Sequence, residues 1–358
     1  MKAPPRPARQ TASGHRFHAL DGLRGIAALA VVFVHSFGKE GGLPNAGLAV
    51  DFFFLMSGFV IAHSYSGRLA AGMSPRSFYM FRFVRLYPMI FAGAILGIGL
   101  GCVHNLTNPA DAYPWPEIVA SGSLSLLALP YLVPALNIYI FSFNPPMWSL
   151  FFEAVANFIF GLIDRRTGTA VLFAIVAVSL AWTVMAGPPG GSVKADFYQG
   201  FPRVLAGFFG GVAVFRVWTE YPAPWLRGGL ATCAVPVIAV MALPYSVDGL
   251  GFLAAFLVLL VTLWAAVNAR PGPLDGFSAR LGEASYPIYL LHYISLYVVT
   301  FVVRKLGLSD HMNVALALHL AVMPVLGLLA YRWYEKPAIR SLKAAMTARP
   351  RVLAAASA

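Results

Sequence analysis

Apolar residues along the chain gather into runs of about 20, separated by short polar segments that hold most of the charges. An α-helix of about 20 apolar residues matches the ~30 Å hydrocarbon core of a membrane. The pattern predicts ten spans, at residues 20–38, 47–66, 83–103, 145–163, 169–186, 197–218, 226–244, 250–268, 283–303 and 313–334. We therefore expect an all-α fold, a polytopic integral membrane bundle of about ten transmembrane helices, with no second folded domain.

An eleventh apolar segment, residues 118–136, is interrupted by Pro130 and Pro134. Whether it crosses decides the side on which every later loop lies, and basic residues favour the cytoplasmic side. With a cytoplasmic N-terminus and no crossing here, 19 basic side chains fall inside, 4 fall outside, and Arg24, Arg85 and Arg203 stay within or at the ends of spans. The inside set is Lys2, Arg6, Arg9, Arg16, Arg68, Arg76, Arg82, Arg165, Arg166, Arg216, Arg227, Arg270, Arg280, Arg332, Lys336, Arg340, Lys343, Arg349 and Arg351; the outside set is Lys39, Lys194, Arg304 and Lys305. We therefore predict that both termini are cytoplasmic and that 118–136 is re-entrant or lies on the outer side.

Composition agrees with a membrane protein. Hydrophobic residues make up 59% of the 358 positions and charged residues only 11%, against about a quarter in soluble proteins. The net charge of +12 fits cytoplasmic loops better than a nucleic-acid partner, and no nucleic acid is expected. Cys102 and Cys233 lie in or beside apolar runs, which predicts packing residues and not a disulfide.

The first span carries charges that a membrane helix tolerates only at a cost of several kcal/mol. Asp21, Arg24 and His35 all lie in it. Arg24 and His35 are eleven residues apart, about three turns plus 20°, so they project from one face and are separated by roughly 16 Å along the axis. A lone histidine in a helix is more often structural than catalytic. Two costly groups aligned on one face favour a functional site.

Asp51 begins the second span, near the expected depth of His35. Its carboxylate could hold the imidazole in one tautomer, or it could be the N-cap of its helix, and the two roles are compatible. Arg82 and Arg85 lie one turn apart where the third span begins. They could snorkel to lipid phosphates, or form with Arg24 a cluster suited to binding a phosphate group.

Glu153 lies about two turns inside the fourth of the ten spans, too deep to reach water. A carboxylate at this depth should be protonated or paired, and Arg203 is one candidate partner. His63 and His292 are further buried polar residues, for which we expect structural roles.

Six motifs follow one another along the chain: "LDGLRGIAALAVVFVH", "VDFFFLMSGFVI", "FRFVRLYP", "PPMWSLFFE", "LGEASYPIYLLH" and "YRWYEKP". In this order they resemble the acyltransferase 3 family of bacterial membrane acyltransferases. The resemblance covers about residues 18–340 and implies one acyltransferase domain there. The basic, Pro-rich composition of the N-terminus predicts a disordered cytoplasmic tail at 1–17, and 341–358 is expected to be a cytoplasmic tail. The resemblance also implies transfer of acyl groups, usually acetyl, from acyl-CoA to hydroxyls of cell-envelope or secreted carbohydrates. The family's essential pair would be His35 and Arg24, and its Arg-x-x-Arg pair Arg82 and Arg85.

Resemblance and geometry together suggest a mechanism. Arg24, Arg82 and Arg85 would hold the phosphates of acyl-CoA, in the simplest case acetyl-CoA, at the cytoplasmic face. His35, oriented by Asp51 or Glu153, would act as general base on an acceptor hydroxyl, or would itself be acylated first. No metal is expected, because no metal-ligand spacing is present.

The expected surroundings are the lipid bilayer of the bacterial cytoplasmic (inner) membrane. A glycan or lipid-linked sugar is the expected acceptor, and envelope-glycan biosynthesis proteins are candidate partners. Three alternatives remain open at this point: a transporter, which would explain intramembrane charges; a flippase-like scaffold without catalysis; and an acyltransferase acting on a small, macrolide-type acceptor. A transporter predicts inverted repeats, whereas the charged motifs here concentrate in the first 153 residues.

Overall fold

The computed structural model describes residues 16–133, 136–164, 167–221 and 229–355, with side chains described up to residue 346. The predicted tail at 1–17 therefore lies almost wholly outside the described residues. The α-helices are α1 His18–Phe37, α2 Leu48–Ala70, α3 Pro75–Thr107, α4 Trp115–Leu126, α5 Met147–Ile163, α6 Thr169–Met185, α7 Gly200–Glu220, α8 Gly229–Ala242, α9 Gly249–Val267, α10 Asp275–Lys305, α11 Met312–Ala330 and α12 Lys336–Ala355. Tyr139 and Val193 form an isolated antiparallel bridge.

The all-α, polytopic prediction is confirmed. Seven helical segments in the described ranges are long and apolar enough to cross a membrane: His18–Phe37, Leu48–Ala70, Pro75–Thr107, Lys194–Glu220, Gly249–Val267, Asp275–Lys305 and Ser309–Met346. Three shorter apolar helices, Met147–Ile163, Thr169–Met185 and Gly229–Ala242, occupy the remaining predicted spans. Each of the ten predicted runs thus corresponds to one apolar helix.

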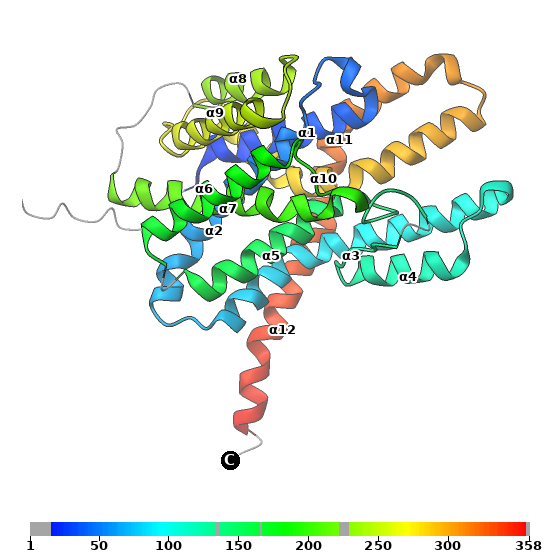
Figure 1. Cartoon of the computed structure of the whole chain (residues 1–358). Coiled ribbons are helices and arrows are strands. Elements are labelled where there is room, and N and C mark those ends of the chain that lie inside the picture. The colour runs from blue at the N-terminus through cyan, green and yellow to red at the C-terminus, as the bar shows by residue number, and fades with distance from the viewer. Residues whose placement is uncertain (1–15, 134–135, 165–166, 222–228, 356–358) are drawn as a thin grey trace, which may run out of the picture.

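The short helix α4, Trp115–Leu126, begins just before the eleventh apolar segment and ends within it. Its 12 residues span only about 18 Å, less than the ~30 Å of a hydrocarbon core. It lies against α3 (Figure 1), and the Tyr87 hydroxyl of α3 donates to Leu126 O at its end. The chain then returns, because the Phe143 ring lies 6.2 Å from that of Tyr113, which precedes α4. The segment enters and leaves at the same end of α3.

The bundle is built from long helices packed in pairs. α1 lies along α10, α2 along α7, and α10 also contacts α11 (Figure 1). Large aromatic side chains fill the core between these helices; Phe52, Phe59, Phe160 and Phe208 are fully buried. The helices that carry the charged motifs, α1, α2, α3, α5 and α10, therefore meet in the interior.

Glycines allow α2 and α7 to approach closely. A Cβ atom on Gly58 would lie 1.8 Å from Phe208 O, and one on Gly211 would lie 2.0 Å from Leu55 O. Real Cβ atoms do not come so close to a carbonyl, so only glycine fits at either position at this helix spacing. Small residues are the usual device for such contacts between membrane helices.

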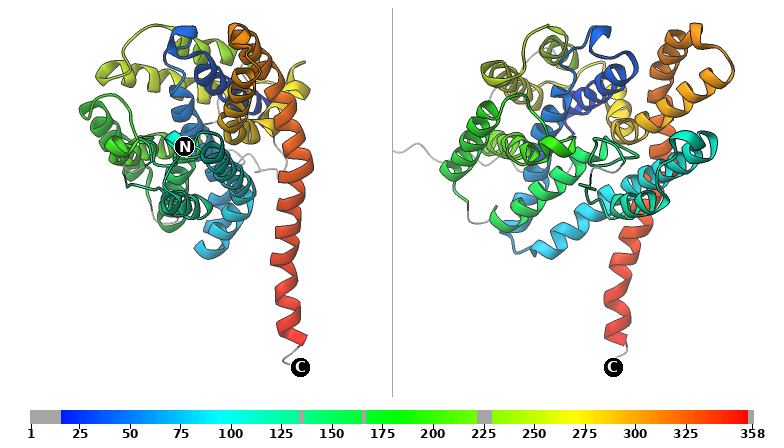
Figure 2. Two further views of the ribbon diagram at one scale, coloured as in Figure 1. Left: turned by 90° about the vertical axis from the view of Figure 1, so that its right-hand side faces the viewer. Right: turned by 45° about the vertical axis from the view of Figure 1, so that its right-hand side comes forward.

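The chain ends in one long helical segment, Ser309–Met346, that contains the π-helical turn Tyr331–Glu335. After this turn, α12 leaves the bundle and projects away from it, as both views in Figure 2 show. π-helical turns are rare and frequent at functional sites. This one places the Glu335 side chain, which is fully buried, in the interior.

Candidate active site

One cavity contains the three predicted anion-binding side chains. This arginine cavity, of about 170 Å³, is lined by Arg24, Arg82 and Arg85, and also by Glu153. The arginines come from α1 and from the start of α3. That helix begins at a cap in which the Ser74 hydroxyl accepts from the Ser77 N–H at 3.2 Å, followed by proline at the first helical position, a favourable helix start. The cluster predicted from the sequence is thus formed in space.

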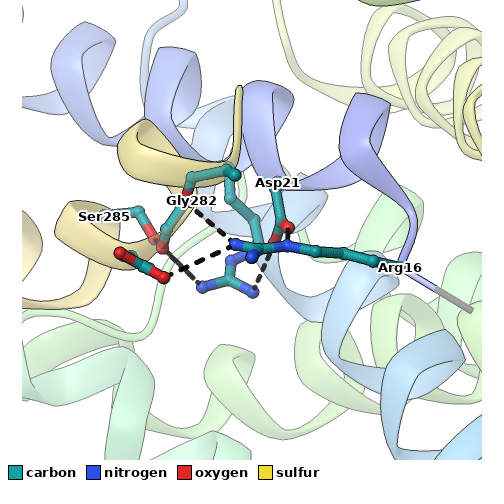
Figure 3. Close-up of polar contacts among 7 residues, drawn as sticks. Arg16, Asp21, Gly282 and Ser285 are labelled. Carbon is teal, nitrogen blue, oxygen red and sulfur yellow. Dashed lines mark hydrogen bonds and ion pairs between the residues drawn. The ribbon is translucent and has the colours of Figure 1, made fainter. Parts of the chain in front are cut away.

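Arg24 is held mainly by α10. Its Nη2 donates to Gly282 O at 2.9 Å and to the Ser285 hydroxyl at 3.2 Å. Its nearest carboxylate, Asp21, is 3.6 Å away, and the same carboxylate accepts a 2.7 Å hydrogen bond from Arg16 (Figure 3). Because Asp21 is shared between two guanidinium groups, the positive charge of Arg24 is only partly compensated.

Arg82 is paired with Glu153. Its Nη2 lies 3.1 Å from Glu153 Oε1, and its Nε donates to Asn157 Oδ1 at 3.0 Å. The Ser57 hydroxyl adds a 2.6 Å hydrogen bond to the same carboxylate oxygen. Glu153 is therefore paired, as its depth predicted, but Arg203 as its partner was wrong. Arg203, on α7, is paired instead with Asp51 of α2.

Arg85 is paired with Glu335 of the π-helical turn. Its guanidinium also lies over the Tyr286 ring, 5.3 Å from the ring centroid. Sequence reasoning missed Glu335 as a site residue. A single carboxylate directly after the last apolar run, inside the motif "YRWYEKP", was the signal that could have identified it.

A second cavity contains the predicted catalytic base. This histidine cavity, of about 310 Å³, is lined by His35, Lys39, Trp148 and Arg203 among other residues. His35 is accessible in it. Its Nδ1 lies 2.8 Å from Val31 O, and because a carbonyl only accepts, Nδ1 carries the proton in the neutral ring. The lone pair is then on Nε2, for which the described residues supply no hydrogen-bond partner. An imidazole in this tautomer can accept a proton from a hydroxyl.

The expected orientation of His35 by Asp51 or Glu153 does not occur. Asp51 forms a two-bond ion pair with Arg203, Nε to Oδ1 and Nη2 to Oδ2, both at 2.8 Å. Only 1% of the Asp51 side chain and 6% of the Arg203 side chain are exposed. The close α2–α7 contact sets these two charges side by side, so both carboxylate oxygens of Asp51 are taken by Arg203. Main-chain Val31 O takes the orienting role instead.

The two histidines for which we expect structural roles, His63 and His292, lie outside both cavities. The His292 ring is buried and its Nδ1 is 2.8 Å from Tyr289 O, with the ring centroid 5.1 Å from that of His35. His63 lies among aromatic rings, including Phe59 and Trp218.

The two cavities together can hold an anion near one end and a proton acceptor near the other. Within the described ranges no three His, Cys, Asp or Glu side chains come close enough to hold a metal ion. In the arginine cavity, the cationic side chains that could contact a charged cofactor are the three arginines. Their existing partners, Glu153, Glu335 and Asp21, would compete with any anion that enters.

Comparison with known proteins identifies the fold family. A family model described as an acyltransferase domain matches residues 17–333. The chain is 27% identical over 334 residues to exopolysaccharide production protein ExoZ of Rhizobium meliloti (strain 1021), an alignment that covers 86% of this chain and 94% of ExoZ.

Two further relatives are similar. Acyltransferase MdmB of Streptomyces mycarofaciens is 26% identical over 374 residues, covering 91% of this chain and 92% of MdmB. Protein 2 in picA locus of Rhizobium radiobacter is 36% identical over 176 residues, covering 46% of this chain and 91% of that protein. No solved structure matches the chain.

Proposed function

The chain belongs to the acyltransferase 3 family, and from that premise we propose that it moves an acyl group, in the simplest case acetyl, from acyl-CoA to a carbohydrate hydroxyl. The family makes the protein a membrane-bound acyltransferase and sets the transporter and scaffold alternatives aside. The acceptor we propose is a glycan or lipid-linked sugar of the cell envelope or a secreted polysaccharide. The name of the relative ExoZ, an exopolysaccharide production protein, supports this choice.

The single observation that carries the donor assignment is the convergence of Arg24, Arg82 and Arg85 on one cavity. Arginine is the side chain best suited to bidentate phosphate binding. Each guanidinium is held by at least one other group before a ligand enters, which keeps the cluster in place. We propose that the phosphates of CoA bind chiefly to Arg24, whose charge is least compensated, and displace Glu153 or Glu335 from the other two.

The tautomer of His35 supports direct transfer as the first route. Nε2 accepts the proton of the acceptor hydroxyl while its oxygen attacks the thioester carbonyl carbon. The new C–O bond forms, the C–S bond breaks, and the CoA thiolate leaves and takes the proton from the imidazolium. The separation of roughly 16 Å between Arg24 and His35, eleven helical residues, would be spanned by the pantetheine arm.

A second route is acylation of His35 itself. Nε2 would attack the thioester, and the acyl-imidazole would then transfer the group to the acceptor. An acyl label on the His35 peptide after incubation with acyl-CoA alone distinguishes this route from direct transfer.

We also propose that the protein lies in the bacterial cytoplasmic membrane with both termini inside. The distribution of basic residues supports this orientation, which places the arginine cavity toward the cytoplasmic acyl-CoA pool and His35 toward the outer surface. Enzymes of envelope-glycan biosynthesis would then supply the acceptor.

The test uses purified protein in lipid nanodiscs, radiolabelled acetyl-CoA and crude envelope glycan. Removing the base in His35→Ala should lower transfer by about 10²-fold or more, the usual contribution of a general base. His311→Ala is the matched control, because His311 is an exposed histidine of the short helix η4 Ser309–His311.

Equal transfer by wild type and His35→Ala would contradict the assignment of His35. Label that passes only to small hydroxyl compounds would leave the donor assignment standing and replace the carbohydrate with the small-molecule acceptor.

A further inference from the structure

Tyr289 of α10 lies where the two cavities meet. Of the described residues that line the arginine cavity, it is the one that also lines the histidine cavity. Its side chain is buried, with 5% of its surface exposed.

Three segments near Tyr289 line one cavity with one part of their length and the other cavity with the next part. On α1 the arginine cavity is lined at Arg24 and the histidine cavity from Val31 onward. On α2 the histidine cavity is lined up to Val50 and the arginine cavity from Phe53 onward. At the start of α5 two successive residues line different cavities: Trp148 lines the histidine cavity and Ser149 the arginine cavity. The cavities are therefore stacked along the bundle with one thin boundary between them.

Tyr289 is fixed in this boundary from three sides. Its hydroxyl and that of Ser149 are 2.8 Å apart and hydrogen bonded. The Phe53 ring meets the Tyr289 ring edge-on, with centroids 5.4 Å apart. Its own carbonyl is bonded to Nδ1 of His292, whose ring lies next to His35. The ring and its hydrogen bond thus separate the arginine cavity from the histidine cavity.

An acyl-CoA whose phosphates lie on the arginines must bring its thioester across this boundary to reach His35. We propose that Tyr289 is a positioning residue that closes the boundary until the donor enters: the pantetheine arm separates Tyr289 from Ser149 and passes between them. This role rests on the proposed donor. The closed boundary itself does not, and it can be tested without any acyl transfer.

The test measures from which side of the membrane a cysteine in the arginine cavity reacts. Cys102 and Cys233 are replaced by serine and alanine, and Val60→Cys, which lines the arginine cavity, is labelled with a charged, membrane-impermeant methanethiosulfonate. Right-side-out and inside-out vesicles are compared. With Tyr289 intact we expect reaction from one side only. With Tyr289→Ala we expect reaction from both sides, and unchanged sidedness would overturn the proposal.

Two milder variants keep the test decisive if Tyr289→Ala does not fold. Tyr289→Phe and Ser149→Ala each remove the hydrogen bond and keep the ring. Each should raise labelling about fivefold from the side of the membrane that does not react when Tyr289 is intact. This is the increase in the open population expected when one ordinary hydrogen bond is lost. Tyr79→Phe is the matched control, because its hydroxyl donates to Phe158 O at 2.9 Å and it lines neither cavity. Labelling in Tyr289→Phe that equals the control would also overturn the proposal.

Acetyl-CoA then separates this proposal from the proposed function. An open boundary admits water, so Tyr289→Phe should raise hydrolysis of acetyl-CoA relative to transfer, while Tyr79→Phe should not. If the wild type shows no reaction with acetyl-CoA but sidedness still changes in Tyr289→Ala, the boundary stands and the donor is wrong. If acetyl transfer proceeds and sidedness never changes, the donor stands and the role of Tyr289 is wrong.

Discussion

At the scale of single residues, the pair Asp51–Arg203 decides what the carboxylate near His35 does. Both side chains are buried and joined by two hydrogen bonds of 2.8 Å. Removing one charge of such a pair leaves the other uncompensated, which typically costs about 3–5 kcal/mol. We therefore expect Asp51→Asn to lower thermal stability sharply in detergent, measured as the temperature at which half the protein remains monodisperse. Asp310→Asn, at an exposed position of η4, should not.

Activity separates this role from an orienting one. A carboxylate that holds a catalytic imidazole contributes about 10⁴ in kcat. If Asp51 acts only through Arg203, the folded fraction of Asp51→Asn, assayed at low temperature, should keep a kcat near that of wild type. A loss approaching 10⁴ in that fraction would restore Asp51 as the partner of His35.

At the scale of elements, the sequence predicts depth well and neighbours poorly. The apolar runs place Arg24, Arg82 and Arg85 near one level and His35 at another, because depth follows from counting residues along a helix. Which carboxylate meets which arginine depends on how α2, α5 and α7 rotate against each other. Packing decides that rotation, so the exchange of partners between Glu153 and Asp51 could not be read from spacing. The hydrogen bond that His35 Nδ1 donates to Val31 O was predictable in kind, since it follows the ordinary spacing of four residues within a helix.

The α2–α7 contact gives an element-level prediction. In Gly58→Ala the new Cβ would meet Phe208 O at 1.8 Å, so the helices must separate. Overpacking of this kind costs typically about 1–3 kcal/mol, and it would also pull Asp51 on α2 away from Arg203 on α7. Gly67→Ala on the same helix is the control, because its Cβ would meet nothing within 4 Å and alanine favours helix by about 1 kcal/mol.

Thermal stability in detergent should fall for Gly58→Ala and hold or rise for Gly67→Ala. Equal behaviour of the two variants would show that α2 and α7 lie further apart than in this structure.

At the scale of the whole molecule, the stacked cavities are useful only if the two ends of the bundle face different compartments. That requirement rests on the short segment around α4, because a full crossing there would invert every later helix relative to α1. Two contacts argue for a return to the same end: Tyr87 reaches Leu126 at the inner end of α4, and Phe143 comes back to Tyr113. Positive charge gives the same result independently, with 19 basic residues against 4 when the segment does not cross.

Cysteine labelling in intact cells tests this arrangement. In a chain without Cys102 and Cys233, Asp111→Cys and Leu132→Cys stand on either side of α4, and both positions are exposed. Both should react with an impermeant maleimide from outside the cell. Ala71→Cys, exposed between α2 and α3, should react only after the membrane is opened. If Asp111→Cys and Leu132→Cys react from opposite sides, α4 crosses, and α5 and every later helix are inverted relative to α1. The charge rule would then no longer place the arginine cavity on the cytoplasmic side.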